Sequence, residues 1–264
     1  MPRLSNRVAL LVGGGGGIGV ASAVAFAREG ATVVVADLAE DLAAVAAEKV
    51  QEAGGKGWAT QVDALEPGSL EALVAEVVGR HGRLDVMHNL TSTTVLAPSV
   101  DLSLSDFEKV FRVTVLGQFV GAQAAARHMI EAGAGGSIIN MSSIGGHGGL
   151  PRRAAYTSCA AAIVNLTRTL GVEWAPYGIR VNAIAPAWIM TDALQGYNEQ
   201  FPGVLDFPAL EERIPLGRFG GVDEIAQVAL FLATDESSFV TGTTILADGG
   251  VVAYIGPGGK PSTQ

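Results

Sequence analysis

This 264-residue chain has little of what several protein classes need. It contains one cysteine, Cys159, so no disulfide can form within the chain, and a reducing compartment is expected. It has no long basic run and a net charge of −9, which argues against nucleic acid as a partner. No uncharged apolar run reaches about 18 residues, and the polar first six residues do not resemble a secretion signal. We therefore expect a soluble, cytoplasmic protein with no membrane contact and no metal site.

Apolar residues, by contrast, are plentiful. They make up 48% of the chain, which is enough for a substantial core. The length suits one large domain or two small ones. Cys159 could act as a nucleophile, but we favour a small buried packing residue, because free cysteine is among the most buried residue types.

Short β-branched runs alternate with helical segments along the chain. Strands are expected at 7–12, 32–36, 57–62, 84–88, 137–141, 179–184 and 243–246. Helices are expected at 18–29, 41–53, 69–80, 105–132, 154–175 and 222–233. Strands buried on both faces and separated by helices imply a parallel sheet covered on both sides. We therefore predict a single doubly wound α/β domain over residues 1–264, with a central parallel sheet of about seven strands.

The first chemical signal is a glycine string that follows the apolar run Val8–Val12. Gly13, Gly17 and Gly19 are spaced as G-x-x-x-G-x-G. Glycines allow a tight turn and let a pyrophosphate approach the backbone, where the N-terminus of the next helix offers N–H groups. A flexible turn is the alternative. We favour nucleotide binding, because the string lies between a predicted strand and a predicted helix and an acid follows.

That acid is Asp37, at the end of the second predicted strand and eighteen residues after Gly19. A carboxylate there can accept hydrogen bonds from the adenosine ribose and would repel a 2′-phosphate. No arginine lies within residues 35–39. The pattern favours NAD over NADP, although a helix-capping or solvated acid would look the same.

A serine and a tyrosine supply the second signal. Ser143 precedes Tyr156 by thirteen residues. The glycine string, this spacing and the apolar alternation together resemble the short-chain dehydrogenase/reductase family over nearly the whole chain. The resemblance implies a Rossmann-type fold and an NAD(H)-dependent oxidoreductase that acts on an alcohol or ketone.

The resemblance also assigns cofactor contacts residue by residue. Asp63 would lie beside the adenine, although a surface turn acid is nearly as plausible, and Ala64 would line the ring. Asn89 begins a segment that packs under the adenine and ribose, but residues 90–92 differ from the family's Asn-Ala-Gly. Ile189 would offer its backbone to the carboxamide, and Thr191 its hydroxyl to the carboxamide or a phosphate; ordinary loop packing is the alternative. The pyrophosphate would lie over the loop formed by Gly13, Gly17, Ile18 and Gly19.

The catalytic set implied by the resemblance is incomplete. Tyr156 would exchange a proton with the substrate oxygen, which Ser143 would hold. A tyrosine has an ordinary pKa of about 10, and the family places a lysine four residues later, which favours the phenolate. Here that position is Ala160. Thr114 stands where the family often has an asparagine that holds a water in the same proton path.

These departures leave other functions open. The chain could be a cofactor-binding pseudoenzyme, a regulatory subunit, a lyase or isomerase, or an engineered Lys-to-Ala variant. A boundary role for Tyr156 is also possible. Proton transfer could pass to His88 or His147, although each is more often a packing or surface residue. Arg152 and Arg153, just before Tyr156, are expected to be solvated or at a subunit contact.

Three further expectations complete the prediction. Residues 192–216, with several apolar side chains, suggest a lid over a small and fairly apolar alcohol or ketone. Residues 256–264 are rich in Gly and Pro and suggest a loose tail or a subunit contact. The helices at 105–132 and 154–175 carry apolar residues around much of their circumference. Their burial points to a homo-oligomer, and the resemblance implies a tetramer.

Overall fold

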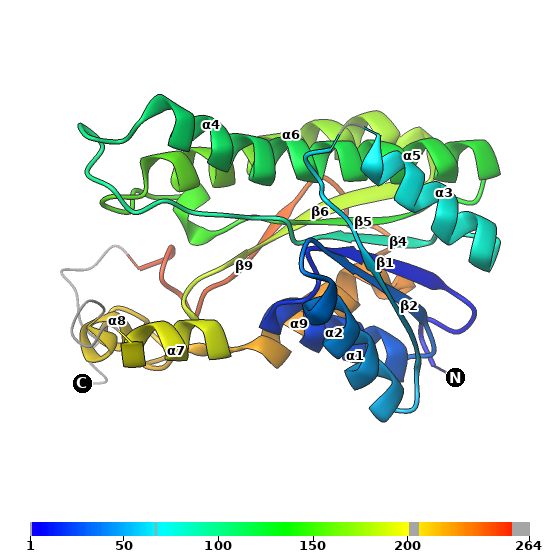
Figure 1. Cartoon of the computed structure of the whole chain (residues 1–264), viewed down its shortest axis with the longest axis horizontal. Helices are drawn as coiled ribbons and strands as arrows, with labels where there is room; N and C mark the ends of the chain where they lie inside the picture. The colour runs from blue at the N-terminus through cyan, green and yellow to red at the C-terminus, as the bar shows by residue number, and fades with distance from the viewer. Residues whose placement is uncertain (1, 67, 201–205, 255–264) are drawn as a thin grey trace.

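The computed structural model describes residues 2–66, 68–200 and 206–254, and shows a sheet with helices on both faces (Figure 1). The sheet has seven parallel strands, which confirms the predicted fold class. In spatial order they are β3 (Lys56–Gln61), β2 (Thr32–Asp37), β1 (Val8–Val12), β4 (Val86–Asn89), β5 (Gly136–Met141), β6 (Ile179–Pro186) and β9 (Thr244–Ala247). The strand order reverses between β1 and β4, which is where doubly wound sheets bind ligands.

Two apolar layers lie against the two faces of the sheet. One contains α1 (Gly17–Arg28), α2 (Glu40–Glu52) and α9 (Val222–Ala233). The other contains α3 (Ser69–His81), α5 (Gly117–Ala132) and α6 (Ala154–Trp174). Figure 1 shows the second group above the sheet and the first below it. Successive side chains of a strand point to opposite faces, so alternate residues of β1 enter the two layers.

The long helix predicted at 105–132 is interrupted. It consists of α4 (Leu104–Phe111), a π-helical turn at Arg112–Leu116, and α5. A π turn inserts extra backbone without breaking the apolar periodicity, so the sequence pattern does not reveal it. Thr114 lies in the middle of this turn.

The predicted lid contains structure of its own. α7 (Asp192–Gln200) and α8 (Phe207–Glu212) lie within it, and two-residue strands pair beside it, β7 (Ile189–Met190) with β8 (Gly220–Gly221). Residues 201–205 of the lid and the predicted tail at 256–264 lie outside the described residues. In the described part of the chain, no helix is both long and apolar enough to cross a bilayer.

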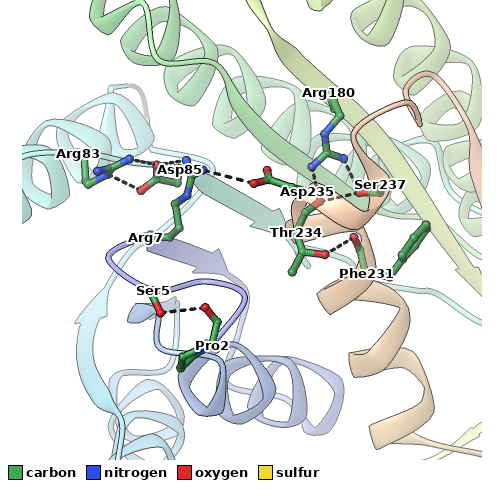
Figure 2. Close-up of polar contacts among 10 residues, drawn as sticks. All are labelled: Pro2, Ser5, Arg7, Arg83, Asp85, Arg180, Phe231, Thr234, Asp235 and Ser237. Carbon is green, nitrogen blue, oxygen red and sulfur yellow. Dashed lines mark hydrogen bonds and ion pairs between the residues drawn. The ribbon is translucent and has the colours of Figure 1, made fainter.

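A buried carboxylate ties together the amino ends of the strands (Figure 2). Asp85 accepts hydrogen bonds from the Val8 N–H at 2.8 Å, from Arg83 at 2.6 and 2.8 Å, and from Arg7 at 3.1 Å. Burial by itself raises the pKa of the carboxyl group, but these bonds outweigh it and the net pKa is lowered. Since Asp85 directly precedes β4 and Val8 begins β1, this cluster joins the two central strands.

We expect Asp85→Asn to lower the free energy of unfolding by about 2–4 kcal/mol at neutral pH, because the guanidinium groups lose their charged partner. The folded-state pKa is lowered, so this stability is present above the unfolded pKa and is lost as pH falls through the folded pKa. Denaturant unfolding at pH 7 measures the change. Asp235→Asn is the matched control: its side chain is 92% exposed and 3.9 Å from Arg7, so it should change stability little. Equal losses in the two variants would contradict this account.

Candidate functional site

The carboxyl ends of β1, β2 and β4 bring together several loops that are distant in sequence. The glycine loop follows β1, Asp37 ends β2, and residues 90–98 follow β4. Two backbone contacts join the loops. A Cβ atom at Gly13 would lie 2.9 Å from the Thr91 nitrogen, and the Leu90 N–H donates to the Val12 carbonyl at 2.8 Å. The site therefore occupies the switch point of the sheet.

Within the glycine loop, the packing requires glycine at several positions. Gly13 has a φ of +74°, a conformation that other residues rarely adopt. A Cβ at Gly19 would overlap the carbonyl oxygen of Gly14, and one at Gly15 would lie 2.6 Å from the Leu42 Cβ. Gly16 and Gly17 are exposed instead, and a Cβ at Gly16 would contact nothing. The loop is thus packed on its inner side and open on its outer side.

The open side exposes the N-terminus of α1. Its N-cap, Gly16, provides no side-chain acceptor, and its first turn carries no acid. Two side chains lie close to this N-terminus: a Cβ at Gly17 would lie 3.5 Å from Thr191 Cγ2 and 3.4 Å from Val222 Cγ1. Free backbone N–H groups at a helix N-terminus favour an anion such as a pyrophosphate, so this cradle fits the predicted group.

Asp37 lies at the edge of the cradle. Its carboxylate is partly exposed and accepts hydrogen bonds from the Gly15 N–H at 2.9 Å and the Ala39 N–H at 3.1 Å. The following helix adds Glu40 and Asp41 in its first turn, so the surroundings are acidic. A carboxylate held here can accept hydrogen bonds from ribose hydroxyls, and its negative charge would repel a phosphate on the ribose 2′ oxygen.

Asp63 and Ala64 follow β3 beside Asp37. The Val62 N–H donates to the Asp37 carbonyl at 2.9 Å, which brings the two strand ends together. The Asp63 carboxylate accepts the Leu65 N–H at 2.8 Å, the geometry of a turn. Ala64 lies 3.5 Å from the position of a Cβ at Gly117. Their proposed contacts with adenine stay predictions.

The side chains of Asn89 and Ile189, two predicted cofactor residues, are both buried. Asn89 is 1% exposed and donates to Asn140 at 3.0 Å, and Asn140 donates to Thr167 at 3.1 Å. Its amide therefore holds strands together rather than facing the cradle. The Ile189 side chain is buried as well, so only its backbone in β7 is placed for the predicted role.

Ser143 and Tyr156 come from adjoining elements. Ser143 caps the short turn Ile144–Gly146, and its Oγ accepts the Gly145 N–H at 3.1 Å. This turn packs on the first turns of α6: a Cβ at Gly145 would lie 3.0 Å from Thr157 Cγ2, and one at Gly146 would lie 2.9 Å from the Ala160 carbonyl. The Ser143 turn and the first turns of α6 are therefore neighbours, and the joint role of Ser143 and Tyr156 stays a prediction.

Ala160 and Thr114, the two positions that depart from the family's catalytic set, are both buried. Ala160 is 3% exposed, and its carbonyl accepts the Ser142 hydroxyl at 2.9 Å. The Thr114 hydroxyl accepts the Thr93 N–H at 3.4 Å, so the π-helical turn contacts the loop after β4. Neither side chain carries a charge.

Two residues to which the sequence assigned no role in the site also lie here. Gln118 is fully buried. Its Nε2 donates to the Met141 carbonyl at 2.9 Å and to the Thr91 carbonyl at 3.1 Å, and its Oε1 accepts the Met141 N–H at 3.0 Å. A glutamine among the alanines of α5 was the available signal. Arg153 was expected to be solvated or at a subunit contact. It is partly exposed, and its guanidinium carbon lies 5.9 Å from the centroid of the Tyr156 ring.

The two histidines considered as alternative proton-transfer residues, His88 and His147, differ in burial. His88 is fully buried in β4 with its ring 6.2 Å from that of Phe26, and neither ring nitrogen has a described hydrogen-bond partner. Burial lowers the pKa of His88 to about 3, which agrees with the favoured expectation of a packing residue and argues against the alternative of proton transfer. His147 is exposed on the turn after Ser143. Cys159 is buried as predicted, and burial raises the pKa of its thiol to about 11, which suits packing rather than nucleophilic attack.

A cavity of about 540 Å³ lies beside the β7–β8 pair. Its lining includes Trp188, Ile214 and Leu216, with the Arg218–Glu224 ion pair at 2.8 Å. Neither Ser143 nor Tyr156 lines it. Among the residues that the structure describes, no group of three or more His, Cys, Asp or Glu side chains is placed to hold a metal.

Known proteins share this arrangement. A family model described as "Enoyl-(Acyl carrier protein) reductase" matches residues 13–252. The chain is 36% identical to the NAD-dependent glycerol dehydrogenase of Listeria innocua over 247 residues, 94% of each chain. It superposes with a TM-score of 0.84 on a short-chain type dehydrogenase/reductase from Mycobacterium marinum, at 34% identity over 94% of this chain and 96% of that one. The chain belongs to the short-chain dehydrogenase/reductase family. A further structure in this group, from Agrobacterium tumefaciens with bound NADP, gives a TM-score of 0.87 at 31% identity over 95% of this chain and 98% of that one.

These relatives confirm the predicted family and make the chain a member of a family of oxidoreductases that use nicotinamide cofactors. Members of the short-chain dehydrogenase/reductase family act on small molecules, which agrees with the prediction of a small-molecule substrate.

The buried histidine generates a stability prediction. In the unfolded chain His88 takes up a proton below about pH 6.5, whereas in the folded protein it stays neutral down to about pH 3. The free energy of unfolding should therefore fall by about 3 kcal/mol between pH 7 and pH 4. We expect His88→Leu to remove most of this pH dependence and to raise stability at pH 4, as measured by denaturant unfolding. The exposed His147→Leu should leave the pH dependence unchanged. A His88→Leu protein as acid-sensitive as the parent would refute the assignment.

Proposed function

We propose that the chain is an NAD(H)-dependent oxidoreductase that interconverts an alcohol and a ketone, with Tyr156 as the proton-exchanging residue and Ser143 holding the substrate oxygen. The observation that carries the proposal is that the Ser143 turn packs on the helix turn of Tyr156. Ser143 follows β5 and Tyr156 lies in the first turn of α6, while Asp37 ends β2 and the anion cradle follows β1.

The hydrogen bonds of Ser143 suit this role. Its Oγ accepts the Gly145 N–H, so its own proton is free to be donated to a substrate oxygen. The bound dinucleotide would supply or accept the hydride. Tyr156 would give its phenolic proton to the carbonyl oxygen during reduction, or take the alcohol proton during oxidation.

Support for NAD comes from the charge around the ribose site. Asp37 and the acids of α2 oppose a 2′-phosphate, and Gly16 carries no side chain that could neutralise one. The Listeria relative is named NAD-dependent, whereas the Agrobacterium structure holds NADP, so relatives divide on this point.

The altered proton relay is part of the proposal. The buried methyl group of Ala160 provides no charge to favour a phenolate, and Thr114 offers a hydroxyl in the π-helical turn. We further propose one domain over residues 1–264, a fairly apolar alcohol or ketone as substrate, a lid at 192–216, and a cytoplasmic homotetramer that buries α5 and α6 against other subunits. Exposed apolar residues such as Val172, 76% exposed on α6, support a subunit contact.

A second function is favoured by Ala160 alone. A protein that binds the dinucleotide without redox turnover would keep the cradle and Asp37 and would not need a charged relay. Dinucleotide binding without turnover of any secondary alcohol or ketone would favour this alternative.

The first prediction concerns cofactor choice. We expect NAD to bind at least about tenfold more tightly than NADP in calorimetric titrations, because the Asp37 carboxylate repels the extra phosphate. Asp37→Asn keeps the shape and an acceptor for the Gly15 N–H but removes the charge. It should narrow the difference, mainly by improving NADP binding. NADP binding equal to or tighter than NAD binding in the parent would contradict the proposal.

The second prediction concerns chemistry. Tyr156→Phe should lower the turnover rate by about 10²–10⁴, since it removes a positioned proton donor. NAD affinity should change little, because the phosphates and adenosine ribose would be held elsewhere, at the glycine loop and Asp37. Steady-state kinetics and calorimetry measure the two effects. Near-parent turnover in this variant would remove Tyr156 from the mechanism.

A further inference from the structure

The feature that carries a further inference is the stacking of Arg153 on Tyr156. The guanidinium carbon lies 5.9 Å from the ring centroid, which is within the range of cation–π interactions. We propose that Arg153 is a positioning residue whose charge, acting through the Tyr156 ring, favours the phenolate in place of the lysine that position 160 lacks. This inference rests on the proposed role of Tyr156 as the proton-exchanging residue.

The backbone fixes the place of the Arg153 side chain. Arg153 is the N-cap residue of α6, and its carbonyl accepts the Thr157 N–H at 2.9 Å and the Thr157 hydroxyl at 3.1 Å. Residue 152 before it has a φ of +64°, which is rare outside glycine, and its carbonyl accepts the Ala97 N–H at 3.1 Å. The backbone on both sides of Arg153 is thus anchored, and its guanidinium lies over the ring of the residue three positions later. These anchors are all backbone groups, so replacing the side chain should leave them intact.

The Arg153 charge is not neutralised by a neighbour. Residues 132–172 contain no Asp or Glu, although the chain as a whole carries a net charge of −9. Within the described ranges, Arg153 forms no ion pair. The charged and titratable groups on the elements packed against this end of α6 are His147 and Arg152 on the preceding loop, Arg112 on the π-helical turn, and Asp106, Glu108 and Lys109 on α4.

A cation over the ring affects the two states of tyrosine unequally. It is attracted to the neutral ring by the ring quadrupole, and more strongly to a phenolate, whose negative charge spreads into the ring.

The test uses the full-length chain and two readouts. The first is the ultraviolet phenolate absorbance as a function of pH, with the Tyr156→Phe spectrum subtracted, and it needs no turnover. The second is the pH profile of kcat/KM. Arg153→Met should move both the Tyr156 midpoint and the kcat/KM profile to higher pH, because the phenolate loses its nearby cation. Arg153→Lys should recover most of the shift. Arg152→Met, the matched control, removes the same charge one residue away and should produce less than half of the shift.

A double variant tests whether Arg153 replaces the lysine. In an Ala160→Lys background the phenolate already has a cation, so the effect of Arg153→Met should fall well below its effect in the parent. Two effects that simply add would overturn the proposal. The calorimetric affinity for NAD checks that each variant keeps its fold, and the single Arg153 variants decide the question if Ala160→Lys does not fold.

Two other outcomes would also overturn the proposal. Equal midpoints in the parent and Arg153→Met would show that the charge does not act on Tyr156. A rise in KM with unchanged midpoints would show that Arg153 binds an anionic substrate instead. If the midpoint shifts but no alcohol or ketone is turned over, the proposed function fails while the assignment of Arg153 to Tyr156 stands.

Discussion

The close approach of backbone to backbone in the glycine loop is the constraint on which the site depends. Gly19 has no room for a side chain against the Gly14 carbonyl, and Gly13 has none against Thr91. These contacts turn the chain back from β1 into α1 and bring the loop after β4 to the same edge of the sheet. A side chain at either position would push α1 away from β4, and the cradle, Asp37 and the Thr191 loop would no longer lie together.

The two halves of the site differ in how they handle charge. The cofactor half uses fixed backbone N–H groups and one carboxylate, and its geometry needs no side-chain cation. The proton-transfer half has no acid within residues 132–172 and no charge at position 160. Its polar groups include the hydroxyls of Ser143 and Thr114, and the Arg153 guanidinium lies over the Tyr156 ring. The proposed proton transfer therefore depends on a positive charge that does not come from position 160 of α6.

Much of this arrangement could be predicted from the sequence, because periodicity and glycine spacing are local signals. The seven strands of the main sheet fall within one or two residues of their predicted ends, and Asp37, Ser143 and Tyr156 lie at the predicted edge. The π-helical turn was missed because it leaves the apolar pattern unchanged, and β7 and β8 because two-residue strands carry no period. The neighbours of the His88 and Arg153 side chains could not be predicted, for another reason. The direction of a single side chain is set by tertiary packing, against Phe26 in one case and the Tyr156 ring in the other.

The most direct test of this account is nicotinamide absorbance with a panel of secondary alcohols and ketones, read beside a calorimetric titration of NAD on the same protein. The account predicts saturable NAD binding together with oxidation of NADH by at least one ketone or reduction of NAD by at least one alcohol. It also predicts a primary isotope effect when the transferred hydrogen is deuterium. Tight NAD binding with no absorbance change for any member of the panel would contradict it.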